Sequence, residues 1–172
     1  MRNITLLLFL ILILVGCNNK NEILDLPCEN FFNESKDEFE KDLSYQSYTI
    51  FFRDSSEEII AHMYFVSLDL KLFYIDLRSV QPICVDNNSK VIFLFNDEST
   101  TEYFVKSEPN CEGKVLIERP FISEFQNKTL KGFRIKTKDG YLDYFIDDNS
   151  KLELKKTASC FFQIANEKLN NK

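Results

Sequence analysis

Tryptophan is absent from this 172-residue chain, and glycine, proline and histidine are scarce, with four, four and one residues. No Cys-x-x-Cys pair accompanies the single histidine, so a zinc site would lack its usual nitrogen and sulfur ligands. No glycine pattern marks a nucleophile elbow, and the acidic turns at residues 86–89 and 97–98 are too short for a calcium-binding loop. We therefore expect no metal site, no cofactor and no catalytic residue that a local motif would identify.

The sequence also lacks an apolar run long enough to cross a membrane. Its apolar run at residues 4–15 would rise only about 18 Å as a helix, against a hydrocarbon layer of about 30 Å. The run follows a short basic start and ends in small residues, which is typical of a secretory signal peptide. Its last residues, Leu14-Val15-Gly16-Cys17, match the bacterial lipobox at all four positions. The chain therefore resembles a bacterial lipoprotein.

The resemblance implies that the chain is cut before Cys17 and that acyl chains on this residue hold the protein to the membrane without a transmembrane helix. An ordinary cleaved signal followed by a chance cysteine is the alternative. On the lipoprotein interpretation, residues 1–16 are the signal peptide and residues 17–26 are the lipidated cysteine and a polar tether. Residues 27–172 are then a single β-rich domain with a C-terminal helix.

The residues after the lipobox bear on the destination of the protein in the cell envelope. Asn18 in place of Asp resembles the signal for the outer membrane, which is the location we expect. Residues 18–22, Asn-Asn-Lys-Asn-Glu, fit poorly the acidic tag that some bacteria use for surface export. Periplasmic and surface-exposed positions therefore both stay open.

The size and charge of the remaining chain suit one acidic domain. Removing residues 1–16 leaves 156 residues, enough for one domain to bury roughly 70% of its unfolded surface. The signal peptide contains one of the 21 basic residues, so 20 basic and 27 acidic side chains remain and the formal charge is −7. This charge argues against nucleic-acid binding through the whole surface. We expect contact with the membrane through the lipid, and an envelope protein as the other partner.

The middle of the chain has the pattern of antiparallel strands, because short runs rich in β-branched and aromatic residues alternate with polar turns. Clean alternation within several runs, as at residues 73–78, is typical of a sheet with one solvated face. Asp139-Gly140 is a strong hairpin signal between the last two runs. The predicted strands are residues 48–53, 59–66, 71–78, 91–95, 101–106, 113–118, 132–138 and 141–146.

Helices are predicted at three places. A capping-box pair, Ser150 and Glu153, precedes apolar residues spaced by three and four, which predicts an amphipathic helix over residues 149–169. The same capping spacing at residues 35–38 predicts a short helix near the start of the domain. Residues 120–130 are either one helical turn or an irregular crossover.

Seven or eight antiparallel strands followed by one C-terminal helix resemble the pleckstrin-homology-like architecture, a bent sheet or partial barrel plugged at one end by its last helix. The resemblance covers residues 46–169 and rests on the order of the elements alone. It implies an α+β, mainly antiparallel fold. An open antiparallel sheet packed on one helix, as in cystatin-like folds, has the same order of elements and is the alternative.

Four further cysteines in an exported chain indicate disulfides rather than metal ligands. Cys84 and Cys111 each precede a predicted strand, and these two strands, with one between them, run the same way. Both cysteines should then lie at one end of the sheet, so we favour the pair Cys84 and Cys111. Cys28 would then clasp the N-terminal segment to the last helix at Cys160. Buried free thiols are the alternative.

Two polar features of the predicted strands are candidates for a site. His62 lies in an apolar strand with no acidic residue beside it by local spacing, so we expect a partly buried structural imidazole. Arg134, Lys136 and Lys138 share one strand face and could contact an extended anionic partner. A row of cations is more often only the solvated face of its strand.

These observations favour a lipid-anchored binding or accessory domain that is not an enzyme. One alternative is an inhibitor or immunity-type lipoprotein, which suits a small acidic domain with disulfides. Another is an envelope enzyme whose active site is assembled from scattered residues. The sequence does not separate the first two.

Overall fold

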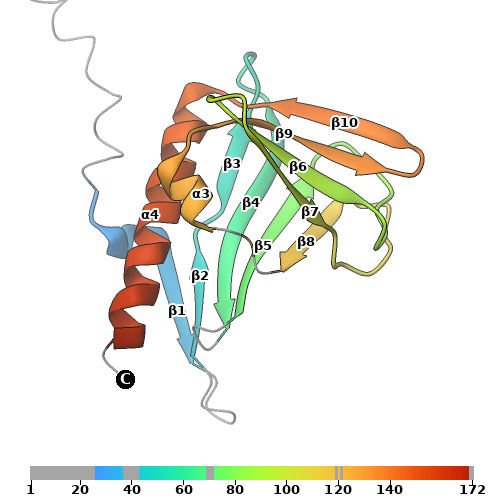
Figure 1. The fold of residues 1–172 in the computed structure, drawn as a ribbon. Coiled ribbons are helices and arrows are strands. Elements are labelled where there is room, and N and C mark those ends of the chain that lie inside the picture. The colour runs from blue at the N-terminus through green and yellow to red at the C-terminus, as the bar shows by residue number, and fades with distance from the viewer. Residues whose placement is uncertain (1–25, 37–42, 69–71, 119, 121, 171–172) are drawn as a thin grey trace, which may run out of the picture.

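The computed structural model describes residues 26–36, 43–68, 72–118, 120 and 122–170 (Figure 1). The lipobox and nearly all of the predicted tether lie outside the described residues. The first sheet contains β1 (Phe32–Lys36), β2 (Leu43–Ser47), β3 (Ile50–Arg53), β4 (Ile59–Leu68), β5 (Leu72–Ser79) and β8 (Lys114–Glu118). The second sheet contains β6 (Lys90–Phe95), β7 (Thr100–Phe104), β9 (Leu130–Thr137) and β10 (Gly140–Phe145). The helices are the 3-10 helix η1 (Cys28–Phe31), α3 (Ile122–Asn127) and α4 (Asp148–Asn170).

All strand pairs are antiparallel, so the predicted α+β, mainly antiparallel fold with a C-terminal helix is confirmed. The first sheet has the order β1-β2-β4-β5-β8 with β3 on β4, and the second has the order β10-β9-β6-β7. The described strands form two open sheets and no closed barrel, so the alternative of an open sheet packed on a helix describes the form better than the pleckstrin-homology-like partial barrel. All eight predicted strands are present, each within two residues of its predicted ends.

The described part of the short helix predicted near residues 35–38 is strand instead, and residues 37–42 lie outside the described residues. Residues 32–36 are β1, which pairs with β2 from Phe32 opposite Ser47 to Lys36 opposite Leu43. The Phe32 ring lies 5.6 Å from the Phe161 ring of α4. Pairing with a strand and packing on a distant helix therefore outweigh the local capping signal.

The C-terminal helix is confirmed, but its cap is not the predicted one. The helix begins at Asp148, and the Asp147 carboxylate accepts hydrogen bonds from the backbone N–H groups of Asn149 (2.8 Å) and Ser150 (3.1 Å). Asp147 is therefore the N-cap residue. The Ser150 hydroxyl instead donates to the carbonyl of Phe51 at 3.0 Å, which ties the start of α4 to β3.

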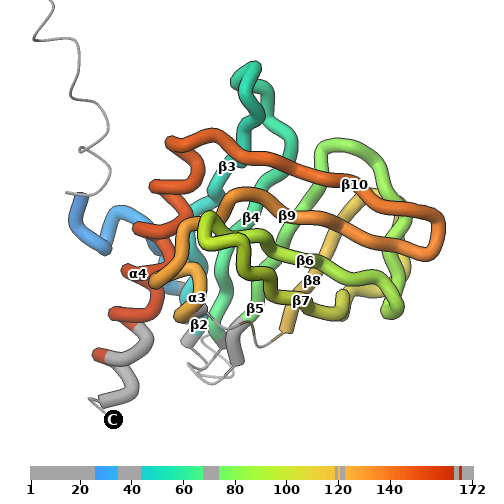
Figure 2. The backbone as a smooth tube through the Cα atoms, turned by 45° about the horizontal axis from the view of Figure 1, so that its top comes forward, coloured from blue at the N-terminus to red at the C-terminus, as the bar shows by residue number. Residues whose placement is uncertain are grey.

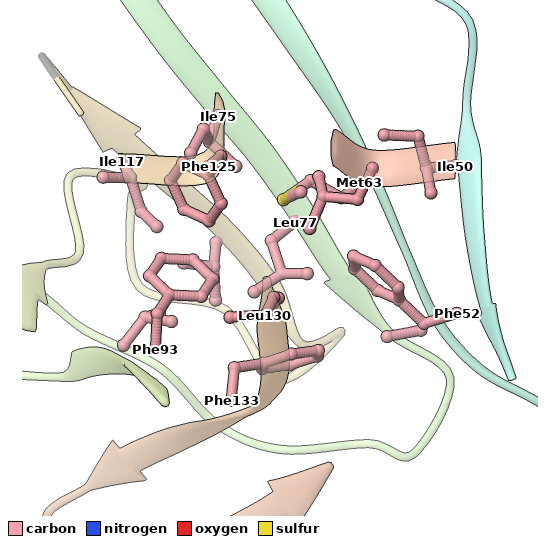
Figure 3. Close-up of a cluster of buried hydrophobic side chains, with 14 of the residues drawn as sticks. Ile50, Phe52, Met63, Ile75, Leu77, Phe93, Ile117, Phe125, Leu130 and Phe133 are labelled. Atoms are coloured by element: carbon pink, nitrogen blue, oxygen red, sulfur yellow. The ribbon is translucent and has the colours of Figure 1, made fainter. Parts of the chain in front are cut away.

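The core lies between the inner face of the first sheet and a cover made by the second sheet and the two α-helices (Figures 1 and 3). Phe52 of β3 packs on Phe133 of β9, with ring centroids 5.6 Å apart. Phe65 of β4 packs on Phe161 of α4 at 5.6 Å and on Phe125 of α3 at 6.0 Å. Aromatic side chains from both sheets and both helices thus form one continuous core.

The two sheets meet along a closed seam, formed where the chain passes from β7 to β8. The backbone N–H of Val105 donates at 3.0 Å to the carbonyl of Ser89, the residue just before β6 of the second sheet. The next residue, Lys106, donates to the carbonyl of Leu116 in the first sheet at 2.8 Å. One extended segment therefore joins the two sheets by backbone hydrogen bonds.

The predicted disulfide between Cys84 and Cys111 is present. The reason for the pairing differs from the expected one, because β6 and β8 belong to different sheets. The cysteines meet because their neighbours Val85 and Asn110 form a two-residue bridge, with N–H to carbonyl distances of 2.8 and 3.0 Å. This isolated antiparallel bridge brings the sulfur atoms together.

The second predicted disulfide, between Cys28 and Cys160, is also present. It joins η1 to α4 across a sequence separation of 132 residues. The start of the described domain is thereby held against the C-terminal helix, on the side of the molecule away from the β9–β10 hairpin (Figure 1).

The opposite junction of the sheets, between β10 and the ends of β4 and β5, is an open seam. Tyr144 of β10 and Ser79 of β5 share a hydrogen bond between their hydroxyl groups at 2.5 Å. The backbone N–H of Asp147, just after β10, donates to the carbonyl of Arg53 at 2.9 Å. Along β10 itself, no strand of the described chain lies on its outer side, and Figure 2 shows it at the margin of the second sheet.

Candidate functional site

The outer face of the second sheet carries exposed aromatic rings. Tyr141 and Phe145 alternate along β10, and their side chains are 60% and 61% exposed. Phe104, at the end of β7, is 55% exposed. Since Leu142 and Tyr144, which alternate with Tyr141, Asp143 and Phe145 along β10, point toward the core, the two rings of β10 occupy the solvated face of the sheet. We call this surface the aromatic face and define it by Phe104, Tyr141 and Phe145 together with Ile92 and Leu94 of β6.

A shallow groove of about 230 Å³ crosses the aromatic face above Gly132. Gly132 stands in register with Phe145 on one side and Leu94 on the other, and its missing side chain leaves the hollow. A Cβ atom on Gly132 would lie 2.3 Å from the carbonyl oxygen of Tyr144, so no larger residue fits without a shift of the strands. The close approach of β9 and β10 at Gly132 therefore forms the groove, and its floor is mostly apolar.

Arg134, the first residue of the predicted cation row, is already paired within the sheet. Its guanidinium donates to both carboxylate oxygens of the cross-strand Asp143, at 2.5 and 2.7 Å, and stacks 4.2 Å from the centre of the Tyr141 ring. The hydrogen bond from Arg134 holds the pKa of Asp143 below its usual value. The positive charge of Arg134 is thus largely offset before any partner arrives.

The other two cations of the row occupy different positions. Lys136 is exposed on β9 and stands in register with Lys90 of β6. Lys138 lies beyond β9, in the turn that leads to β10. Lys90 itself forms an ion pair with Glu102 of β7. The row is therefore a mixed surface of cations with acidic neighbours, and its contact with an anionic partner stays a prediction.

A polar cluster on the outer face of the first sheet was missed by sequence reasoning. The Asp76 carboxylate, whose residue is only 6% exposed, accepts hydrogen bonds from the hydroxyl of Tyr64 (2.7 Å) and from Nε of Arg78 (3.1 Å). His62 stands in register with Arg78, and Tyr64 with Asp76. We call these four residues the Asp76 cluster. The face expected to be solvated thus contains a buried carboxylate.

The Asp76 cluster contains charges that act on His62. Burial lowers the pKa of the imidazole, Arg78 lowers it further, and Asp76 partly counteracts both effects. His62 is therefore neutral at pH 7. An acidic residue does lie near His62, brought there by the pairing of β4 with β5 rather than by local spacing. Because Arg78 and Tyr64 already donate to Asp76, the cluster is suited to holding β4 and β5 in register.

The open seam contains a groove of about 550 Å³ beside β10. Apolar side chains from three places line it: Ile59 at the start of β4, Val80 after β5, and Phe145 of β10. The carboxylates of Asp54 and Asp147 also line it. The groove therefore combines an apolar wall with a negatively charged rim, next to the outer edge of β10.

Neither a metal-binding cluster nor a membrane-spanning helix is present among the described residues. No three side chains of the kind that bind metals gather there around one point. No helix in the described segments combines the length and apolar character needed to cross a bilayer.

No protein-family model, curated protein or solved structure matches this chain. Its function must therefore be inferred from the residues and the geometry of the chain itself.

Proposed function

We propose that this chain is a lipid-anchored protein of the bacterial envelope, which binds a partner protein and is not an enzyme. The lipobox ending at Cys17 supports the anchor. The single observation that supports binding is the aromatic face, where large rings stay exposed on the solvated side of the second sheet and one of them, Phe145, borders a groove. Tyrosine and phenylalanine contribute strongly to protein interfaces because they bury large areas at a low cost in conformational entropy.

The position of the aromatic face fits a tethered binding domain. The described chain begins at Leu26, next to η1 and α4. The β9–β10 hairpin lies at the opposite end of the molecule (Figure 1). A domain held by its N-terminal side therefore directs the aromatic face away from its point of attachment. The anchor also raises the local concentration of the domain for partners at the same membrane.

The lipid anchor can be tested by substitution of Cys17. We expect Cys17→Ser to abolish labelling with a radioactive fatty acid and to release the protein from the membrane fraction or leave an uncut precursor, because lipid transfer requires the thiol. Cys28→Ser, which alters a cysteine after the predicted tether, is the matched control and should leave labelling intact. Equal labelling of wild type and Cys17→Ser would contradict the proposed anchor.

The binding face can be tested with a photoreactive phenylalanine analogue in living cells. We expect the analogue at position 145 or 141 to give a discrete cross-linked product. At position 48, between β2 and β3, where Tyr48 is 48% exposed, it should give none. A secreted toxin or hydrolase in the product would indicate the inhibitor role, and an assembly or transport protein the accessory role. The same products from positions 145 and 48 would overturn the assignment of the face.

A further inference from the structure

The outer edge of β10 lacks lysine, proline, a bulge and, in the described part of the chain, a covering strand, four features that commonly keep an edge strand from pairing. Edge strands are commonly protected by lysine, proline, a bulge or a covering segment. β10 has the sequence Gly-Tyr-Leu-Asp-Tyr-Phe, without lysine or proline, and pairs with β9 in regular register. At the other margin of the sheet, β7 pairs with β6 alone among the described strands, but the chain just beyond it joins the first sheet, because Lys106 bonds to Leu116 of β8. The edge of β10 is the open counterpart of that closed seam.

β10 is also held in place before any partner binds. Its inward residue Tyr144 stacks on Phe133 with ring centroids 4.6 Å apart and bonds to the hydroxyl of Ser79 across the seam. Beyond the strand, Asp147 bonds to the carbonyl of Arg53 in β3. An edge fixed at these points requires little ordering when another strand pairs with it.

The groove of the open seam runs beside this edge and has a definite charge. None of its lining residues is lysine or arginine, and Asp54, Asp143 and Asp147 all contribute to it. Hydrogen bonds from Ser56 lower the pKa of Asp54. Burial alone would raise the pKa of Asp147, but hydrogen bonds from Ser150 and Asn149 hold it below its usual value. These carboxylates are ionised at neutral pH. The groups that hydrogen-bond to Asp54 and Asp147 are uncharged, so they do not neutralise the two negative charges.

We propose that the open seam binds an extended segment of a partner protein, which pairs with β10 as an added strand. An apolar side chain of the segment would rest against Ile59 and Val80, and flanking lysine or arginine residues would meet Asp54 and Asp147. The six residues of β10 span about 20 Å, so the paired segment has five or six residues. This inference rests on the proposed binding function and specifies the chemistry of the partner.

Charge favours such a partner over a second copy of this chain. Pairing through β10 would place a second copy, which has the same excess of acidic residues, beside the acidic groove. Each copy also has a formal net charge of −6. Like charges at close range oppose association, whereas a basic segment is attracted to the rim.

The test uses the full chain in nanodiscs of zwitterionic phosphatidylcholine, with empty nanodiscs as the blank. The probe is a fluorescent peptide in which valine and isoleucine alternate with threonine between lysine flanks, and fluorescence anisotropy measures its affinity. We expect saturable binding. A peptide with glutamate flanks should bind about tenfold more weakly, because attractions to the rim become repulsions. A peptide with N-methylated central amides should bind about tenfold more weakly, because it loses backbone donors.

Two variants and one local readout complete the test. Val80→Lys places a cation in the groove at a residue that is already 57% exposed, and it should abolish binding without unfolding the domain. Tyr48→Lys, at an exposed position between β2 and β3, is the matched control and should bind like wild type. The peptide should slow amide hydrogen exchange in β10 and leave β7 unchanged.

Three outcomes would overturn the inference: no saturable binding, equal binding by the N-methylated peptide, or a concentration-dependent dimer that the peptide does not dissociate. Failure of this test alongside a cross-linked product from position 145 would leave the proposed binding function standing. The partner would then contact the aromatic face without pairing to the edge. Absence of both signals would reject the binding function as well.

Discussion

The closed seam and the open seam join the same two sheets in opposite ways. At the closed seam, Val105 and Lys106 bond to Ser89 and Leu116, and a disulfide lies nearby. At the open seam, one hydroxyl pair and one backbone bond connect the sheets, and β10 keeps an unpaired edge. A junction closed by backbone hydrogen bonds has few groups left to offer a partner. The open seam retains such groups beside an apolar, acidic groove, which is why we place the added strand of the partner there.

The largest expected effect comes from removing the disulfide beside the closed seam. The double variant Cys84→Ser and Cys111→Ser removes a bridge across a sequence separation of 27 residues. We expect a loss of about 3 to 4 kcal/mol in the free energy of unfolding, because the unfolded chain gains loop entropy. Chemical denaturation measures this loss. Unchanged stability, or four alkylatable thiols in the native wild-type protein, would contradict the assigned bridge.

A smaller effect is expected where β9 approaches β10. Gly132→Ala places a Cβ atom 2.3 Å from the carbonyl oxygen of Tyr144, so the two strands must separate. We expect a loss of about 1 to 3 kcal/mol, as is typical of overpacking. Faster amide exchange confined to β9 and β10 would locate the change. Thr100→Ala on the same face removes an exposed side chain and serves as the control, with an expected change within about 0.5 kcal/mol.

The open seam itself can be weakened by removing a single hydroxyl group. Tyr144→Phe removes the hydroxyl that bonds to Ser79 and leaves the ring stacked on Phe133. We expect a loss of about 1 kcal/mol, the usual net contribution of a hydrogen bond. Tyr141→Phe, which alters an exposed ring on the same strand, should be neutral. If both variants had equal stability, the hydroxyl pair would not hold the seam together.

The smallest effect depends on pH and concerns Glu153, near the end of the open seam. Burial raises the pKa of Glu153 above its usual value, and the nearby charge of Asp147 raises it further, while Arg53 opposes both. The folded state therefore binds this proton more tightly than the unfolded state. The stability that it contributes is complete below the unfolded-state pKa and is lost as the pH rises through the raised folded-state pKa.

We accordingly expect Glu153→Gln to raise the melting temperature at pH 7 by a few degrees, and the gain to disappear near pH 4. Melting curves at several pH values measure this. Glu112→Gln, at an exposed position in the segment before β8, is the matched control. A gain of the same size at pH 4 and pH 7 would show that the charge of Glu153 is not the cause.

Local patterns identified most of the elements. Alternating apolar residues predicted eight strands, because a strand that buries one face must repeat every two residues. A period near 3.6 predicted α4 in the same way. The same local logic failed at β1, where the capping signal at residues 35–38 competed with pairing to β2 and packing on α4. Those two contacts involve distant residues, so no local window contains them.

Side-chain partners depended on register. The sequence correctly places Arg134 and Lys136 on the solvated side of their strand, opposite Phe133 and Ile135. That Arg134 would meet Asp143 follows from the pairing of β9 with β10, and that Asp76 would lie beside Tyr64 follows from the pairing of β4 with β5. A shift of one residue in either pair would have produced different partners. An alternating pattern specifies the face of a residue but not its cross-strand neighbour.

By itself, the sequence determined the antiparallel α+β class, the C-terminal helix, which residues face the core, and the lipobox on which the proposed anchor rests. These properties follow from short-range periodicity, composition and a contiguous motif. Only the tertiary structure decided that the strands divide into two sheets, that one seam closes while the other stays open, and that an acidic groove lies beside an unpaired edge. These properties arise when segments far apart in the chain compete for the same backbone hydrogen bonds and the same apolar surface, and that competition is settled only in the folded molecule.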